Sequence, residues 1–241
     1  MAKGVFIVGT DTDVGKTIVT AGIMHVLRSN GYNACYFKAA LSGAFEIGNK
    51  LVPCDTRLSC EVSNLEEDYE NITPYVYKVE VSPHLAAKLE NNPIQIEVIR
   101  EKYEYLKGKY DYIIAEGSGG IVCPLIDDER GLYTLENLIK DLNMSVVIVA
   151  RGGVGTINHT VLTVKYIESI GISIKGIIIN NYIDNIICND NIKMIEKLTK
   201  VQIIGKLKHI ENLKDSRLQA IRIHAKEAFS TKIIEECMDQ L

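Results

Sequence analysis

The chain has 241 residues, of which 46% are hydrophobic and 24% are charged, with no Trp and a formal net charge of -4. A mildly acidic chain with scattered lysines is not expected to have nucleic acid as its main partner. No apolar run approaches the ~20 residues of a membrane helix, and the six cysteines show neither a C-x-x-C pair nor a ligand spacing with histidine, so we expect a cytoplasmic protein without a structural zinc site.

Short apolar runs alternate with helical patterns along the whole chain. The expected strands cover residues 4–9, 34–40, 110–117, 145–150, 174–180 and 201–207, and the expected helices include 134–142 and a long closing helix over 216–241. Strands that alternate with helices pair in parallel through right-handed crossovers. We therefore predict an α/β fold, a three-layer parallel sheet with helices on both faces that resembles the P-loop NTPases, in a single domain over residues 1–241. Ligands in such folds bind beyond the carboxyl ends of the strands.

The first strand runs into the sequence GTDTDVGKT, residues 9–17. This is close to the phosphate-loop pattern G-x-x-x-x-G-K-[ST], with its first glycine one position early. A helix N-terminus binds anions, Lys16 can reach the β- and γ-phosphates, and the Thr17 hydroxyl can bind Mg²⁺. Asp11 is expected to cap the turn locally, whereas Asp13 is expected to direct its side chain away from the phosphates.

Charged residues also stand at or near the next two strand ends. Lys38 is either a surface lysine or a second cation that offsets the charge developing during phosphoryl transfer. Asp55 is either a helix N-cap or a metal ligand. Glu116 ends an apolar strand and precedes the glycine-rich turn 117–120, which is the layout of a metal-side carboxylate in a phosphate-loop enzyme.

The last two candidate segments follow the later strands. The turn at 151–159 leads into another helix N-terminus, which can bind an anion. Asn180 and Asn181 end the strand after it, and their amides can both donate to and accept from a purine edge.

Six stretches in this order resemble the dethiobiotin synthetase family, and they run through most of the chain: GTDTDVGKT, KAALSG, SPHLAA, EGSGG, VGTINHTVLT and GIIINN. The resemblance implies a cytoplasmic homodimer of α/β subunits that depends on ATP and Mg²⁺. It also implies that the substrates are 7,8-diaminononanoate and CO₂ or bicarbonate, joined in biotin biosynthesis into the cyclic urea dethiobiotin. The implied intermediates are an N-carbamate and a carbamic-phosphoric anhydride.

Matching positions carry the family's site onto this chain. The resemblance implies catalytic roles for Lys38, Lys16 and Thr12. It implies that Thr17, Asp55 and Glu116 hold Mg²⁺. The nucleotide would contact Asp13, Val14, Gly15, Lys16, Thr17, Ile18, Asp55, Glu116, Gly117, Ser118, Gly119, Asn180 and Asn181. The substrate would contact Thr12, Lys38 and Ser42, and its distant carboxylate would contact Gly155, Thr156 and Asn158 of the neighbouring subunit.

Two alternatives stay open from the sequence. Partitioning or switch ATPases share the fold, but their loop carries an extra lysine near its start, where this chain has Asp11. Amide-forming ligases of the cobyrinate type carry a glutaminase domain, for which 241 residues leave no room. The family's G-x-[IL]-P near the nucleotide base is replaced here by GKLKHIEN, so the contacts from Lys208 to Ile210 and beyond Asp215, and with them the choice of nucleotide, stay open.

Overall fold

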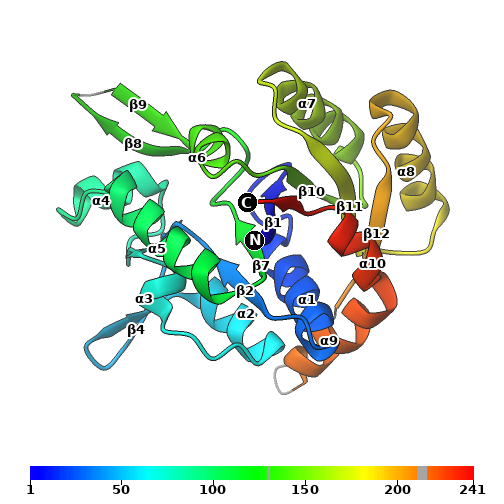
Figure 1. The fold of residues 1–241 in the computed structure, drawn as a ribbon. Coiled ribbons are helices and arrows are strands. Elements are labelled where there is room, and N and C mark those ends of the chain that lie inside the picture. Colours follow the sequence, from blue (N-terminus) through cyan, green and yellow to red (C-terminus); the bar gives the residue numbers. More distant parts are fainter. Residues whose placement is uncertain (130, 211–215) are drawn as a thin grey trace.

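A mostly parallel sheet forms the centre of the molecule in the computed structural model, which describes residues 1–129, 131–210 and 216–241 (Figure 1). Six parallel strands follow the order β12-β11-β10-β1-β7-β2, and β13 pairs antiparallel with the start of β1. Their bounds are β1 Lys3–Gly9, β2 Ala34–Phe37, β7 Tyr112–Glu116, β10 Val146–Arg151, β11 Ile174–Tyr182, β12 Ile203–Lys208 and β13 Asp239–Gln240. The predicted α/β fold with a parallel central sheet is confirmed.

Helices cover both faces of this sheet. They are α1 Lys16–Ser29, α2 Cys54–Ser63, α3 Tyr69–Ile72, α4 Pro83–Leu89, α5 Ile96–Lys109, α6 Leu135–Asp141, α7 Thr156–Ser169, α8 Ile186–Thr199, α9 Arg217–Ala228 and α10 Thr231–Glu236. Helices α1, α2 and α9 pack on one another, and α7 packs on α8 on the opposite side of the sheet (Figure 1). The sheet is therefore the middle of three layers.

Three small sheets decorate the rim. The short strands β3 (Ala40–Leu41) and β6 (Tyr75–Val76) pair in parallel, whereas β4 (Phe45–Ile47) with β5 (Lys50–Val52), and β8 (Pro124–Asp128) with β9 (Gly131–Thr134), form antiparallel hairpins. The β8–β9 hairpin projects from the body of the molecule (Figure 1).

The strands of the central sheet lie where apolar residues run without interruption. In β1 every residue after Lys3 is buried, and in β7 every residue after Tyr112 is buried. A strand that is apolar on both faces needs cover on both faces, which crossover helices supply. The core is thus the sheet itself, and polar groups at its carboxyl edge are held on a rigid base.

Two expected elements differ from the structure. The expected strand 34–40 ends at Phe37, because the Lys38 amide donates to the carbonyl of Ile72 at 2.8 Å and leaves the sheet. The expected closing helix 216–241 breaks at Phe229, whose ring packs against Gly22 and Gly205. The chain then forms α10 and returns as β13 to pair with β1. Helical periodicity could not reveal this turn, since the apolar spacing continues through it.

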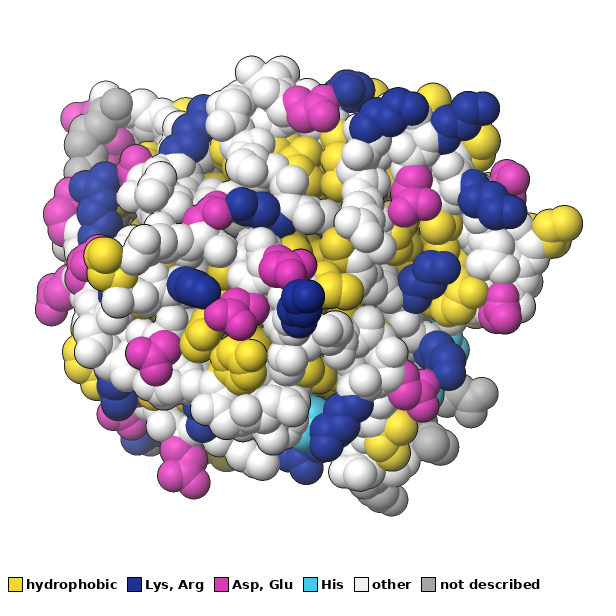
Figure 2. All heavy atoms as spheres, turned by 45° about the vertical axis from the view of Figure 1, so that its right-hand side comes forward, with side chains coloured by type: hydrophobic (Ala, Val, Ile, Leu, Met, Phe, Trp, Pro, Cys, Tyr) yellow, Lys and Arg dark blue, Asp and Glu magenta, His cyan; other side chains and the backbone are white. Residues whose placement is uncertain are grey.

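The face of the molecule drawn in Figure 2 shows no strong separation of charge. On the face drawn in Figure 2, Lys and Arg side chains are interspersed with Asp and Glu. Within the described ranges, no helix is long and apolar enough to cross a membrane.

Candidate active site

The loop between β1 and α1 is fixed by close contact with the end of β11. Gly15 has a φ of +89°, and a Cβ added there would lie 1.9 Å from the Asn180 side-chain nitrogen. That nitrogen donates to the Val14 carbonyl at 2.9 Å. Both the left-handed backbone and the close approach require glycine at position 15. Asn180 is 2% exposed, so in this structure its buried side chain packs under the loop and holds it through the Val14 carbonyl.

Hydrogen bonds within the loop, and from the side chains of Lys16 and Arg151, hold residues 11 and 12. The Thr12 amide donates to Asp11 Oδ1 at 2.7 Å, which confirms local capping by Asp11. Lys16 Nζ donates to the Asp11 carbonyl at 3.0 Å, and Arg151 donates to the Thr12 carbonyl at 3.2 Å. Asp13 has a φ of +57°, in the left-handed region. The side chains of Lys16 and Arg151 thus hold the loop through two of its carbonyl groups.

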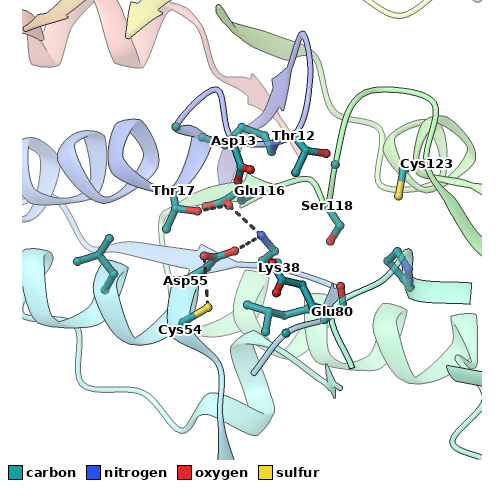
Figure 3. A pocket seen from close by; sticks show the side chains of 18 of the residues that line it. Thr12, Asp13, Thr17, Lys38, Cys54, Asp55, Glu80, Glu116, Ser118 and Cys123 are labelled. Atoms are coloured by element: carbon teal, nitrogen blue, oxygen red, sulfur yellow. Dashed lines mark hydrogen bonds and ion pairs between the residues drawn. The ribbon is translucent and has the colours of Figure 1, made fainter. Parts of the chain in front are cut away.

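Lys38, Asp55, Glu116 and Thr17 form one cluster beside this loop (Figure 3). Lys38 Nζ lies 2.6 Å from Asp55 Oδ2 and 2.9 Å from Glu116 Oε1. The Thr17 hydroxyl donates to the same Glu116 oxygen at 2.8 Å. Lys38 is 4% exposed and is therefore not a surface lysine. For Asp55, no side-chain capping bond is made at the start of α2, so the structure does not support the N-cap alternative.

The charges in this cluster alter one another's proton affinity. Burial alone would lower the pKa of Lys38, but Glu116 and Asp55 raise it well above its ordinary value. Burial would raise the pKa of Asp55, yet the Lys38 ammonium holds it below its usual range. Burial and the charge of Lys38 lower the pKa of Lys16. The opposite shifts of the Lys38 and Asp55 pKa values both favour the charged form, as expected for an ion pair.

A cavity of about 1100 Å³ opens onto the cluster and brings many of the predicted residues together. Its lining includes Thr12, Asp13, Gly15, Lys16, Thr17, Ile18, Lys38, Ser42, Asp55, Glu116, Ser118 and Gly119. Val14 and Gly117 lie behind this wall: Val14 is 1% exposed, and a Cβ on Gly117 would lie 2.8 Å from Leu135. The loops after β1, β2 and β7 thus meet at one site, as their position at the strand ends predicts.

The predicted carboxylate-binding residues lie outside this cavity. Gly155 and Asn158 are exposed at the start of α7, whereas Thr156 is buried and its hydroxyl donates to the Arg151 carbonyl at 2.6 Å. Gly155 has a φ of +86°. Within one subunit these residues are therefore not part of the site around Lys38.

Asn180, Asn181 and residues 208–210, which were considered for contacts with a nucleotide base, also lie outside the cavity lining. Asn181 Oδ1 lies 3.2 Å from His209 Nδ1, and Lys208 pairs with Glu227 at 2.8 Å. Asp215 lies outside the described residues. The lining also includes Leu58, which the sequence did not single out, and Arg217, which belongs to the segment beyond Asp215 whose contacts were left open.

The donor set of the cluster fits Mg²⁺. Its groups are two carboxylates and one hydroxyl, all oxygen ligands, and the two carboxylates share one ammonium group. Among the described residues, no group of three or more His, Cys, Asp or Glu side chains forms a metal cage. Mg²⁺ is usually bound by one or two carboxylates together with substrate phosphates, so Thr17, Asp55 and Glu116 suit an ion that arrives with a nucleotide.

Sequence reasoning also missed Tyr36 and Glu80 in this region. Tyr36 donates to Glu116 Oε2 at 3.2 Å, and Glu80 lines the cavity opposite the loop after β1. The expected strand 34–40 offered a signal for Tyr36, because its period of two places residues 36 and 38 on the same side. Glu80 does not follow an apolar strand pattern in the sequence, so only the tertiary structure shows that it lines the cavity.

Known proteins resemble this chain over its full length. A family model described as an AAA domain matches residues 3–217. The chain is 68% identical to the ATP-dependent dethiobiotin synthetase BioD of Clostridium kluyveri over 241 residues, which covers 100% of both chains. It is 47% identical to the protein of that name in Clostridium acetobutylicum, covering 99% of this chain and 100% of the relative.

Solved structures with the same fold have much lower identity. The MinC:MinD cell division protein complex of Aquifex aeolicus aligns with a TM-score of 0.56 at 19% identity, covering 94% of this chain and 95% of that chain. A ParA family ATPase from Chlorobium tepidum TLS aligns with a TM-score of 0.55 at 16% identity, covering 94% of this chain and 91% of that chain. At these identities the likeness establishes the P-loop NTPase-like fold alone.

Proposed function

The chain belongs to the ATP-dependent dethiobiotin synthetase family, and on that premise we propose that it closes a cyclic urea on 7,8-diaminononanoate with CO₂, using ATP and Mg²⁺. The enzyme is an ATP-dependent ligase of biotin biosynthesis. The steps of the reaction and the roles of individual residues are the proposal.

The reaction needs two C–N bonds and one activated oxygen. One substrate amine attacks CO₂ and loses a proton, which gives a carbamate. A carbamate oxygen then attacks the γ-phosphorus of ATP, and the bond between this phosphorus and ADP breaks. The second amine attacks the carbamic-phosphoric anhydride at its carbonyl carbon and loses a proton, and phosphate leaves. The protein's task is to position the reactants and to offset negative charge.

The position of Lys38 is the observation that most supports this proposal. Its ammonium group is buried beside the loop after β1, on the same cavity wall as Lys16. Two lysines at this place can stabilise a carbamate oxygen and a transferring phosphoryl group, which develop negative charge together. To do so, Lys38 exchanges its contacts with Asp55 and Glu116 for contacts with the substrate oxygens.

The nucleotide phosphates would bind over the N-terminus of α1. The backbone N–H groups of Gly15 and Lys16 and the ammonium group of Lys16 would face them there. Thr17, Asp55 and Glu116 would hold Mg²⁺. When bound, this ion neutralises charge on the β- and γ-phosphates. Ser118 and Gly119 would close the cavity over the nucleotide on the side of β7.

The diamine would lie between Thr12 and Ser42, which line the cavity next to the lysines. Its carboxylate would extend toward Gly155, Thr156 and Asn158 of a second subunit. The position of these three residues outside the cavity of their own subunit is compatible with a homodimeric site. The exposed start of α7 offers free N–H groups and a positive dipole end for that carboxylate.

The test of this proposal is isotopic. The purified protein is supplied with labelled bicarbonate, ATP, Mg²⁺ and 7,8-diaminononanoate, and the expected product is labelled dethiobiotin, one molecule for each phosphate released. Omission of the diamine is the control and should abolish the labelled product. Phosphate release without labelled product would overturn the proposal and favour an ATPase switch of the kind that shares this fold.

A further inference from the structure

Glu116 divides its two carboxylate oxygens between two environments. Oε1 accepts from Lys38 at 2.9 Å and from Thr17 at 2.8 Å, and both of these residues line the cavity. Oε2 accepts from the Tyr36 hydroxyl at 3.2 Å. Tyr36 is 0% exposed and is not part of the cavity wall. The carboxylate is therefore held by the core on one side and faces the site on the other.

The sheet register explains why Tyr36 reaches this carboxylate. Strands β2 and β7 are parallel neighbours in which Tyr36 pairs with Ile114. Glu116 follows Ile114 by two residues, so its side chain points to the same face of the sheet as that of Tyr36. A tyrosine is long enough to span this diagonal, and its ring fills the core below the carboxylate.

In the proposed reaction the contacts of the two Glu116 oxygens change differently. Lys38 is recruited by the substrate oxygens and Thr17 by the cation, so the contacts at Oε1 are exchanged when the nucleotide binds. The Tyr36 contact lies away from the cavity and can persist through this exchange. A carboxylate ligand needs such an outer hydrogen bond to keep its orientation.

We infer that Tyr36 is a positioning residue, which holds Glu116 with one oxygen directed toward the divalent cation and the nucleotide. This inference rests on the proposed function, because it assigns Glu116 to the cation. Its consequence is specific: loss of the Tyr36 hydroxyl weakens cation binding and leaves nucleotide binding in the absence of the cation unchanged.

Tyr103 provides the matched control for a purely structural role. Its side chain is 2% exposed, and its buried hydroxyl donates to the Leu142 carbonyl at 3.4 Å. It therefore loses the same kind of group as Tyr36 when it is changed to Phe, but it contacts no carboxylate of the site. A readout that separates the two variants reports on Glu116 and not on core packing.

The experiment measures Mn²⁺ binding by electron paramagnetic resonance in the presence of ADP for the wild type, Tyr36→Phe and Tyr103→Phe. We expect the Mn²⁺ dissociation constant to rise about tenfold in Tyr36→Phe and to stay within about twofold in Tyr103→Phe. The Mg²⁺ concentration for half-maximal activity should rise in parallel, with the ADP affinity measured without metal unchanged.

Two results would overturn the inference: an unchanged Mn²⁺ affinity in Tyr36→Phe, or an equal loss in both variants. Failure of the proposed function is recognised separately. The wild type would then form no labelled dethiobiotin, whatever the variants do to Mn²⁺ binding.

Discussion

Two clusters of this protein each combine a nearly buried glutamate with a lysine and a tyrosine. In the first, Glu67 accepts from Lys109 at 2.7 Å and from Tyr110 at 2.8 Å. In the second, Glu116 accepts from Lys38 at 2.9 Å and from Tyr36 at 3.2 Å. The exposed fractions of the two glutamate side chains are 3% and 0%. The two glutamates are thus similarly buried, whereas the Lys109 side chain is 46% exposed and the Lys38 side chain only 4%.

The clusters differ in what else surrounds the carboxylate. Glu67 also accepts from the Asn71 side chain at 3.0 Å and from the Asp68 amide at 3.1 Å, and it does not line the large cavity. At Glu116 the lysine is shared with a second carboxylate, Asp55, and all three groups line the cavity (Figure 3). A carboxylate with four protein donors stabilises the fold, whereas a lysine shared by two carboxylates at a cavity can be released to a ligand.

The largest expected effect is on turnover in Lys38→Ala. Removal of one group that stabilises developing charge lowers kcat by about 10²–10³-fold. The dissociation constant of ATP should change much less, because the ammonium acts mainly in the transition state. Steady-state kinetics and equilibrium ATP binding measure the two quantities. Equal losses in both would make Lys38 a simple anchor for the ground state.

Lys109→Ala is the matched control for this variant. It removes the lysine of the other cluster, at a distance from the cavity, and kcat should stay within about twofold of the wild type at a temperature where the variant is folded. A loss of turnover as large as that of Lys38→Ala would remove the distinction between the clusters.

The next effect is on stability in Glu67→Gln. Burial alone would raise the pKa of Glu67, but hydrogen bonds from Lys109, Asn71 and Tyr110 lower it to about 2. Since the pKa is lower in the folded state, this stabilisation is fully present above the ordinary value of 4.5 and is lost as the pH falls toward 2. We expect Glu67→Gln to lower the free energy of unfolding by about 2 kcal/mol at pH 7.

Urea denaturation at several pH values measures this effect. The difference between wild type and Glu67→Gln should shrink steadily below pH 4.5. A difference that is independent of pH would show that the charge of Glu67 has no part in the stabilisation, and kcat in the variant should remain that of the wild type.

The smallest effect is on cation binding without nucleotide. Lys38 neutralises two carboxylates in the structure, and its removal leaves Asp55 and Glu116 as like charges close together. Such a pair binds a cation or a proton more strongly. We expect Lys38→Ala to bind Mn²⁺ about tenfold more tightly than the wild type in the absence of nucleotide. Unchanged or weaker binding, measured by electron paramagnetic resonance, would show that Lys38 does not compete with the cation.

Much of the candidate site could be predicted from the sequence because strand ends are visible in it. Lys16, Lys38 and Glu116 each follow an apolar run, and parallel strands bring their carboxyl ends to one edge. Asp55 was ambiguous because it lies in the first turn of α2, where a cap and a ligand have the same residue types. The structure shows no side-chain cap at the start of α2 and a contact of Asp55 with Lys38, which depends on how α2 packs against α1. The role of Asp55 as a metal ligand stays a prediction.

Local patterns were least informative where the chain changes direction. The break at Phe229 follows from the packing of its ring against two glycines that are distant in sequence. The buried position of Asn180, with its amide on the Val14 carbonyl, is also a tertiary contact. In the structure the Asn180 amide donates to the Val14 carbonyl of the phosphate loop. Its expected role in contacting a purine base stays a prediction.

The sequence by itself determined the class of fold, the phosphate loop and the family, because apolar periodicity and motif order are properties of the chain. Only the tertiary structure decided which oxygens and nitrogens meet. The contacts of Glu116 with Thr17, Lys38 and Tyr36 join residues 78 to 99 positions apart. The distances of these contacts are set by sheet register and helix packing, which patterns over a few neighbouring residues do not reveal.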